Sequence, residues 1–233
     1  MKKIIVIIAT KNRTDFLDKA MQSVLLQTRK ADEIIITSDS DSETQMREQT
    51  LCLKYGLTFI KNQYGRNYAG NLNTAIDHII RSRMIENNES INHTFIAFLD
   101  DDDFWHSEYL AECTKAIKKD TDFVVAGLIY HSDNQIQKLS IPNKLTIQDF
   151  LEKNPHIQGS NTFIRLTTLL KAGGFDENMP STTDRDVFTR VMMLNPKYEI
   201  IQQHLVNIDA KNSRVRLTNT QDSKKESLAK FYA

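Results

Sequence analysis

The chain has 233 residues, which is enough for one large α/β domain or two small ones. Its 30 basic and 30 acidic residues cancel, whereas a nucleic-acid-binding protein usually carries a basic excess. No stretch approaches the roughly 18 apolar residues of a membrane-spanning helix. The composition therefore predicts a globular protein that neither binds nucleic acid nor crosses a membrane.

The first half of the chain alternates predicted strands with predicted helices. Short apolar runs without helical periodicity predict buried strands at 3–8, 33–37, 57–61 and 95–99. Helices are expected from Thr14 to Leu25, Glu43 to Tyr55, Ala69 to Met84 and Ser107 to Lys118, with Thr14 and Ser107 as N-caps and Gly56 as a C-terminal stop. This alternation favours a parallel sheet with helices on both faces.

The second half is less regular. A long strand is expected at 123–130 with a partner at 135–139, and another strand at 162–165. Helices are expected at 146–153, 166–172 and 184–194, and the stretch from Lys211 is polar and poorly patterned. Cys52 and Cys113 fall in helical patterns, which predicts buried, reduced thiols in a cytosolic protein.

Four consecutive aspartates, Asp100 to Asp103, directly follow the apolar run that ends at Leu99. Carboxylates clustered at the end of a buried strand suit a hard divalent cation or a metal-bridged phosphate. Ligands of open α/β sheets bind outside the carboxyl ends of the strands, where these acids are expected. The alternative is an acidic turn in which one Asp caps the next helix and the others are solvated.

Two further loops are expected at the same edge of the sheet. The first strand is followed by Thr10, Lys11, Asn12 and Arg13, whose cations beside a helix N-terminus favour phosphate. Asp39 and Asp41 follow the second strand and could accept hydrogen bonds from a base or ribose, or form an Asx turn that caps the next helix. No glycine-rich dinucleotide fingerprint follows the first strand, which counts against a nicotinamide enzyme.

The remaining candidates lie in the second half. Asp184 could act as a general base toward a hydroxyl, or simply cap the helix that it starts. His204, Lys211, Arg214 and Arg216 could meet a diphosphate, or form a solvated basic face.

These motifs in this order resemble glycosyltransferase family 2, the GT-A fold enzymes, from about Ile4 to Val206. The matching segments are Val6–Arg13, Glu33–Asp39, Phe98–Trp105, and Gly173–Glu177 together with Asp184–Asp186. The resemblance implies a GT-A fold: a Rossmann-like, mostly parallel central sheet flanked by helices, with a mixed acceptor-side second half. It further implies a single domain in which residues 1–105 bind the nucleotide sugar, residues 106–210 bind the acceptor, and 211–233 form a tail.

The resemblance also implies roles for individual residues. Donor contacts are expected from Thr10, Asn12, Arg13, Asp39, Asn71, Asp100 and Asp101, with Asp39 at the base. Asp102, together with Asp100, would hold Mn²⁺ or Mg²⁺, and Asp184 would be the catalytic base. The chain departs from the family pattern at Ala9, Lys11, Ser38, Gly70, Thr183 and Lys211. Lys11, Arg13 or Arg66 could replace the Arg and His that the family often directs at the diphosphate.

The implied function is an inverting glycosyltransferase that moves a sugar from a nucleotide-activated donor, a UDP-sugar first of all. Its acceptor would be a glycan or a lipid-linked glycan of a bacterial surface polysaccharide, reached in the cytoplasm or at the inner face of the cytoplasmic membrane. Two alternatives stay open: a metal-dependent nucleotidyltransferase, and a non-catalytic relative that only binds sugar nucleotides.

Overall fold

The computed structural model describes residues 2–86, 89–211 and 230–231. Its first half contains four strands, at β1 Lys3–Thr10, β2 Glu33–Ser38, β3 Thr58–Lys61 and β4 Thr94–Asp100. The helices between them are α1 Thr14–Leu25, α2 Ser42–Tyr55, α3 Tyr68–Glu86 and the short α4 Glu89–Asn92. The predicted strand and helix alternation of this half is confirmed.

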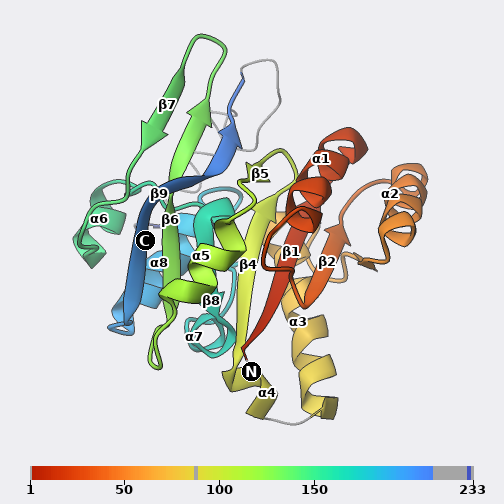
Figure 1. The fold of residues 1–233 in the computed structure, drawn as a ribbon. Helices are drawn as coiled ribbons and strands as arrows, with labels where there is room; N and C mark the ends of the chain where they lie inside the picture. The colour runs from red at the N-terminus through yellow and green to blue at the C-terminus, as the bar shows by residue number, and fades with distance from the viewer. Residues whose placement is uncertain (1, 87–88, 212–229, 232–233) are drawn as a thin grey trace.

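The second half is mixed. Its strands are β5 Phe104–Trp105, β6 Phe123–His131, β7 Ile136–Leu139, β8 Thr162–Arg165 and β9 Tyr198–Asp209. Its helices are α5 Tyr109–Ala116, α6 Ile147–Glu152, α7 Leu166–Lys171 and α8 Thr183–Met193, with a 3₁₀ turn at Gly159–Asn161. The predicted pairing of 123–130 with 135–139 is confirmed as the β6–β7 hairpin, which projects beyond the rest of the sheet (Figure 1).

All the strands of the described residues join one sheet in the order β3-β2-β1-β4-β8-β6-β9-β5, with β7 paired to β6. The strands β1 to β4 are parallel to one another. The antiparallel β8 lies between β4 and β6, so β6 and its parallel partner β9 run in the direction of β4. Most strands therefore share one direction, as the sequence predicts, and their carboxyl ends meet at one edge.

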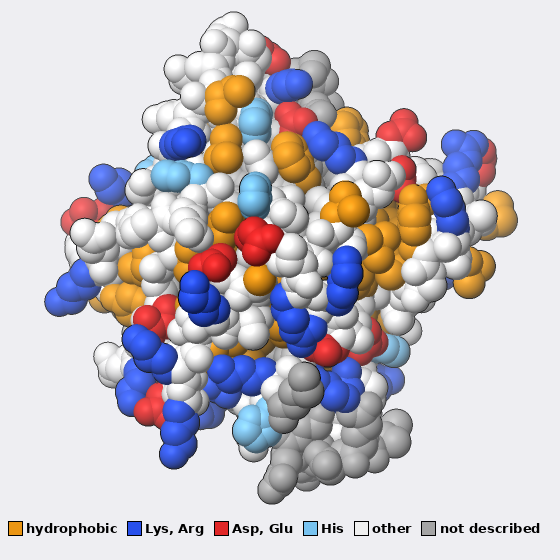
Figure 2. Space-filling view, in the orientation of Figure 1, with side chains coloured by type: hydrophobic (Ala, Val, Ile, Leu, Met, Phe, Trp, Pro, Cys, Tyr) orange, Lys and Arg blue, Asp and Glu red, His pale blue; other side chains and the backbone are white. Residues whose placement is uncertain are grey.

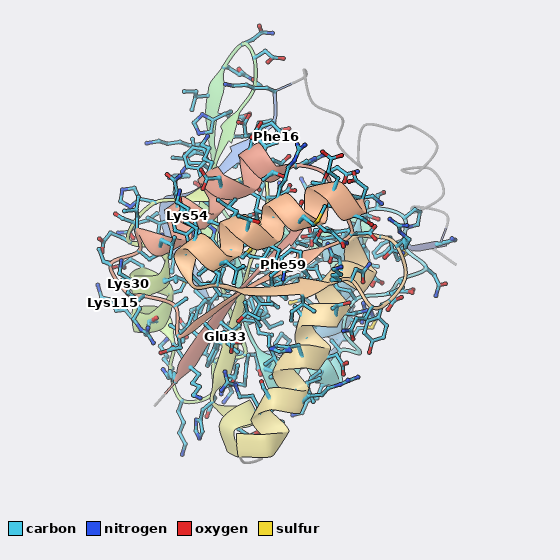
Figure 3. All side chains as sticks on the ribbon, turned by 90° about the vertical axis from the view of Figure 1, so that its right-hand side faces the viewer. Phe16, Lys30, Glu33, Lys54, Phe59 and Lys115 are labelled. Atoms are coloured by element: carbon cyan, nitrogen blue, oxygen red, sulfur yellow. The ribbon has the colours of Figure 1, made fainter. Side chains whose placement is uncertain are left out.

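Apolar residues on both faces of the sheet hold the layers together. Alternate residues of β1 face opposite sides: Ile5 and Ile7 contact one core, whereas Ile4 and Val6 contact the other. A strand buried on both faces must be apolar throughout, which explains its unbroken hydrophobic run. The first core also contains α3, α7 and α8, and the second contains α1, α2 and α5. Figure 3 shows α1 and α2 on their side of the sheet, where Phe59 of β3 packs against the second core.

Three details of the sequence prediction are wrong. Thr14 does not cap α1, because the N-cap residue is Arg13, which makes no side-chain capping bond. Ser107 does not cap α5, which follows Glu108; the Ser107 carbonyl instead accepts a hydrogen bond from the Thr28 amide (2.9 Å). Strand β9 was not predicted, because exposed Gln202 and neighbouring polar residues interrupt its apolar alternation.

Other local predictions are confirmed. Gly56 ends α2 in the left-handed conformation (φ 67°) that glycine adopts without a steric penalty. Cys52 and Cys113 are free, buried thiols. Basic and acidic side chains are interspersed over the face shown in Figure 2. Among the described residues, no helix is both long enough and apolar enough to span a membrane.

Candidate active site

A cavity of about 660 Å³ opens where the carboxyl ends of β1, β2 and β4 meet. Its lining includes Thr10, Arg13, Asp39 and the whole aspartate tetrad, together with the segment from Pro180 to Arg185. The loop after β3 and the N-terminus of α3 contribute further residues. The predicted edge of the sheet thus forms the cavity, and Asp184 lies in the same cavity as the tetrad.

The tetrad folds into a tight turn in which the Asp103 amide donates to the Asp100 carbonyl (3.1 Å). Carboxylate oxygens of Asp100, Asp102 and Asp103 thereby lie within 4.8 Å of one another. Asp102 and Asp103 are 9% and 2% exposed, so the alternative of an acidic turn with solvated carboxylates is wrong. Asp103 is an addition to the pair Asp102 and Asp100 that the sequence singled out.

Neighbouring hydroxyl groups fix the orientation of this cluster. Tyr68 donates to Asp100 Oδ1 at 2.5 Å. Ser160 donates to Asp103 Oδ2 at 2.6 Å, and its oxygen accepts from the Asp100 amide at 3.0 Å. The buried Trp105 indole donates to the Ser160 carbonyl at 2.7 Å. Tyr68 and Ser160 were missed, because nothing in the sequence pattern connects α3 or the 3₁₀ turn with the tetrad.

Asp101 points away from its three neighbours toward β1. It accepts a hydrogen bond from Thr10 Oγ1 (2.8 Å) and pairs with Arg13 (3.2 Å), which also reaches Asp102 (3.4 Å). Burial raises the pKa of Asp101 to about 7, although the Arg13 guanidinium opposes this rise. Arg13 is therefore the cation that directly contacts the acidic cluster.

Asp39 is buried and ion-paired. Its carboxylate contacts Lys11 Nζ at 2.8 Å and Arg66 Nε at 3.3 Å, so these two cations gather at Asp39 rather than at the tetrad. Asp41, the other acid of this loop, does not line the cavity; it is the N-cap of α2 and accepts from the Thr44 amide at 2.9 Å. The structure thus assigns the capping alternative to Asp41 and leaves Asp39 in the cavity.

Asn71 and Asn12 differ in position. Asn71 lines the cavity, donates to the Thr10 carbonyl (3.1 Å), and keeps a buried side-chain oxygen that has no partner among the described residues. Asn12 is exposed and is not among the residues that line the cavity; its amide donates to Ser40 (2.7 Å) and its side-chain oxygen accepts from the Asp41 amide (3.0 Å). Asn12 therefore ties the loops after β1 and β2 together.

Asp184 lies in the first turn of α8, but it is not the N-cap. That position is Thr182, in the left-handed conformation (φ 58°), so the capping alternative for Asp184 is wrong. Burial and the Asp100 carboxylate raise the pKa of Asp184 to about 7, and a hydrogen bond from the Gly159 backbone opposes this rise. A carboxylate with a pKa near neutrality is suited to accept a proton at physiological pH.

The basic residues near the C-terminus do not extend the cavity within the described part of the chain. His204 Nε2 lies 3.3 Å from Ser140 Oγ, and neither His204 nor Lys211 lines the cavity. Arg214 and Arg216 lie outside the described residues.

The side chains of the cluster fit a divalent cation. Three carboxylates supply the hard oxygen ligands that Mn²⁺ and Mg²⁺ prefer. Tyr68 and Ser160 provide the outer hydrogen bonds that orient metal ligands in proteins.

Comparisons with known proteins agree with this architecture. Among solved structures, S. aureus TarS 1-349 in complex with UDP-GlcNAc superposes with a TM-score of 0.71 at 16% identity, covering 96% of this chain and 64% of TarS 1-349. The mannosyltransferase PcManGT from Pyrobaculum calidifontis, in complex with GDP-Man and Mn²⁺, gives a TM-score of 0.64 at 17% identity, covering 90% of this chain and 57% of PcManGT. These similarities confirm the GT-A fold.

Sequence comparison points to the same family. The Escherichia coli protein WfgD, a UDP-Glc:alpha-D-GlcNAc-diphosphoundecaprenol beta-1,3-glucosyltransferase, is 26% identical over 172 residues, which is 73% of this chain and 62% of WfgD. The chain thus spans less than two thirds of the length of these relatives. The family model described as glycosyl transferase family 2 matches residues 5–171. Since this match covers well over half of the sequence, the chain belongs to glycosyl transferase family 2.

Proposed function

We propose that the chain is a metal-dependent, inverting glycosyltransferase that uses a UDP-sugar. The observation that carries this proposal is the placement of Asp100, Asp102 and Asp103 in one cavity with Asp184. A cation-binding cluster for the donor and a separate carboxylate for the acceptor are the two groups that such a transfer needs. The UDP-Glc in the name of WfgD and the UDP-GlcNAc bound to TarS support a uridine nucleotide.

The donor would lie along the ends of β1, β2 and β4. Asp39 would accept hydrogen bonds from the base, and Asn71 offers an oxygen without a partner among the described residues. Arg13 and Thr10, which both contact Asp101, would lie near the diphosphate. In this proposal residues 1–105 bind the donor and residues 106–210 bind the acceptor, as one domain.

The cation would be held by Asp102 and Asp100, with Asp103 in reach. When bound, Mn²⁺ or Mg²⁺ offsets the negative charge that develops on the departing nucleoside diphosphate.

Asp184 would take the proton of the acceptor hydroxyl. The hydroxyl oxygen then forms a bond to the anomeric carbon while the bond from that carbon to the diphosphate oxygen breaks. Because attack and departure occur on opposite faces of the sugar, a single displacement inverts the anomeric configuration. The proton ends on Asp184, whose pKa of about 7 allows it to accept the proton and release it again.

We propose a glycan or lipid-linked glycan as acceptor, in the assembly of a bacterial surface polysaccharide at the cytoplasmic face of the membrane. The name of WfgD, which specifies a diphosphoundecaprenol-linked sugar, supports this acceptor class.

The first experiment is a thermal-shift screen of UDP-sugars with and without Mn²⁺, followed by transfer assays with the donor that binds. A donor at about a hundred times its dissociation constant stabilises a protein by roughly 2.7 kcal/mol. Asp102→Ala is expected to abolish Mn²⁺-dependent release of UDP. Stabilisation by donor that is equal with and without Mn²⁺ would contradict the metal assignment, and release of pyrophosphate would favour a nucleotidyltransferase.

The base assignment has a separate test. Asp184→Asn is expected to lower kcat for transfer by about 10²–10⁴-fold, the usual contribution of a positioned base, with donor binding retained. Asp186→Asn is the matched control, because Asp186 lies on the same helix turn but pairs with Arg190 and does not line the cavity. Full transfer by Asp184→Asn would reject the base assignment.

A further inference from the structure

The hydroxyl of Tyr68 joins two parts of the cavity that lie on different elements. Tyr68 is the first residue of α3, and its hydroxyl donates to Asp100 Oδ1 at the end of β4. The 2.5 Å distance is typical of a hydroxyl that donates to an ionised carboxylate.

The surroundings of Gly159 show that the Asp184 carboxylate lies close to the Tyr68 hydroxyl and to Asp100. A Cβ atom on Gly159 would lie 3.1 Å from the Tyr68 hydroxyl oxygen, 3.5 Å from Asp184 Oδ1 and 3.6 Å from Asp100 Oδ1. Three oxygens from three elements therefore surround the position that a Cβ atom of residue 159 would occupy. Only the contact with Tyr68 is tighter than an ordinary van der Waals contact, so the absence of a side chain at residue 159 chiefly makes room for the Tyr68 hydroxyl.

We propose that Tyr68 is a positioning residue, which holds Asp100 in the orientation that binds the cation although the Asp184 carboxylate lies nearby. This inference rests on the proposed function and extends it to a residue outside the matched motifs. Asp100 and Asp184 carry like charges and repel each other when both are ionised. A hydroxyl that donates to Asp100 stabilises the charge of this carboxylate beside Asp184 and fixes its rotamer.

The direct test is Tyr68→Phe, which removes one oxygen and keeps the ring. Because an outer-shell hydrogen bond to a metal ligand contributes about 10–100-fold in metal affinity or activity, we expect Mn²⁺ affinity in the presence of UDP to fall by about this factor. Isothermal titration calorimetry measures that affinity without turnover. In transfer assays kcat should fall by at least about tenfold. A general loss of folding would instead lower the number of Mn²⁺ sites found in the titration and leave their affinity unchanged.

Tyr64→Phe is the matched control, since Tyr64 precedes the same helix but is 45% exposed and does not line the cavity. Equal Mn²⁺ affinity and equal kcat in Tyr68→Phe and Tyr64→Phe would overturn the inference. If the unmodified protein binds neither Mn²⁺ nor any UDP-sugar, the proposed function itself fails. The two failures are therefore distinguishable.

A double-mutant cycle with Gly159→Ala tests the geometry independently. In the unmodified background the Tyr68 hydroxyl must shift by a few tenths of an ångström to make room for the new methyl group, so Mn²⁺ affinity and kcat should fall. In the Tyr68→Phe background the tight contact is absent, and the same change should alter both by about twofold or less. Such non-additivity is the signature of residues in contact. Equal losses in the two backgrounds would contradict the proposed convergence at residue 159.

Discussion

The buried Asp101 carboxyl should make the stability of the metal-free protein fall with pH between about pH 4 and about pH 8. Burial raises its pKa from the usual 3.8 to about 7. A carboxyl with a higher pKa in the folded state binds its proton more tightly there than in the unfolded chain. Its contribution to stability is therefore greatest at low pH and is lost as pH rises through the folded-state pKa.

The size of the effect follows from proton linkage. Between pH 6 and pH 8 the unfolded carboxyl binds almost no proton, whereas the folded carboxyl passes from about nine-tenths to about one-tenth protonated. Over these two pH units the folded state binds on average about half a proton more than the unfolded state. At about 1.36 kcal/mol per proton per pH unit, the free energy of unfolding therefore falls by about 1.4 kcal/mol. For a chain of this length that loss lowers the melting temperature by roughly 3–6 °C.

The comparison with Asp101→Asn isolates this contribution from that of Asp184, whose pKa of about 7 adds a similar dependence. The amide oxygen of the variant can still accept the hydrogen bond from Thr10. Differential scanning calorimetry in the presence of EDTA, at pH 6, 7 and 8, should show a shallower fall in melting temperature for the variant. An equal fall in melting temperature with pH in the unmodified protein and in Asp101→Asn would refute the reasoning.

Two further variants test the loops around the cavity. Glu48→Ala should destabilise the protein by about 2–6 kcal/mol in urea denaturation, because the buried hydroxyls of Ser38 and Ser40 each lose a carboxylate partner. The control Glu48→Gln, which keeps an acceptor oxygen, should cost clearly less stability. An equal loss of stability in the two variants would contradict this explanation. Alanine normally stabilises a helix relative to glycine. Gly70→Ala should nevertheless lower the melting temperature, because its Cβ would lie 2.2 Å from the Gly65 carbonyl oxygen. A higher melting temperature would show that the loop containing Gly65 moves away at little cost.

The sequence predicts the fold well where burial is uniform. Strands β1 and β4 are apolar on both faces because both faces are covered, so their hydrophobic runs are easily recognised. Strand β9 could not be recognised in this way. It pairs with β6 through register shifts near Gly127, and its exposed segment carries Gln202 and Gln203. Its pairing depends on contacts between distant segments, which no local pattern records.

The candidate site was predictable as a set of loops but not as a set of contacts. Strand order alone places the tetrad at the edge of the sheet where ligands bind. It cannot show that Asp101 turns toward Thr10 while its neighbours face one another, because that division arises from the tight turn after β4. It also cannot indicate Tyr68, whose relation to Asp100 depends on how α3 packs.

Two departures from the usual family pattern have physical explanations in the structure. Ser38 stands where the family commonly has an acid, and here its hydroxyl donates to the buried Glu48 carboxylate at 2.5 Å. An acid at residue 38 would place a second carboxylate against the first, so serine at residue 38 and glutamate at residue 48 form a matched pair. Glu48 also accepts from Ser40, and this pair of serines flanks Asp39 on both sides.

Gly70, which replaces a frequent Arg, is matched in the same way. The Gly65 carbonyl lies so close to Gly70 that no side chain fits there without a shift of the loop. The guanidinium that the family places at this position is therefore sterically excluded, and Arg13 is the described cation that contacts the acidic cluster. Arg13→Gln should consequently weaken UDP binding, measured by calorimetric titration, more than Lys11→Gln does, since Lys11 pairs with Asp39 rather than with the acidic cluster. A larger loss of UDP affinity in Lys11→Gln would show that Lys11, not Arg13, replaces the missing arginine.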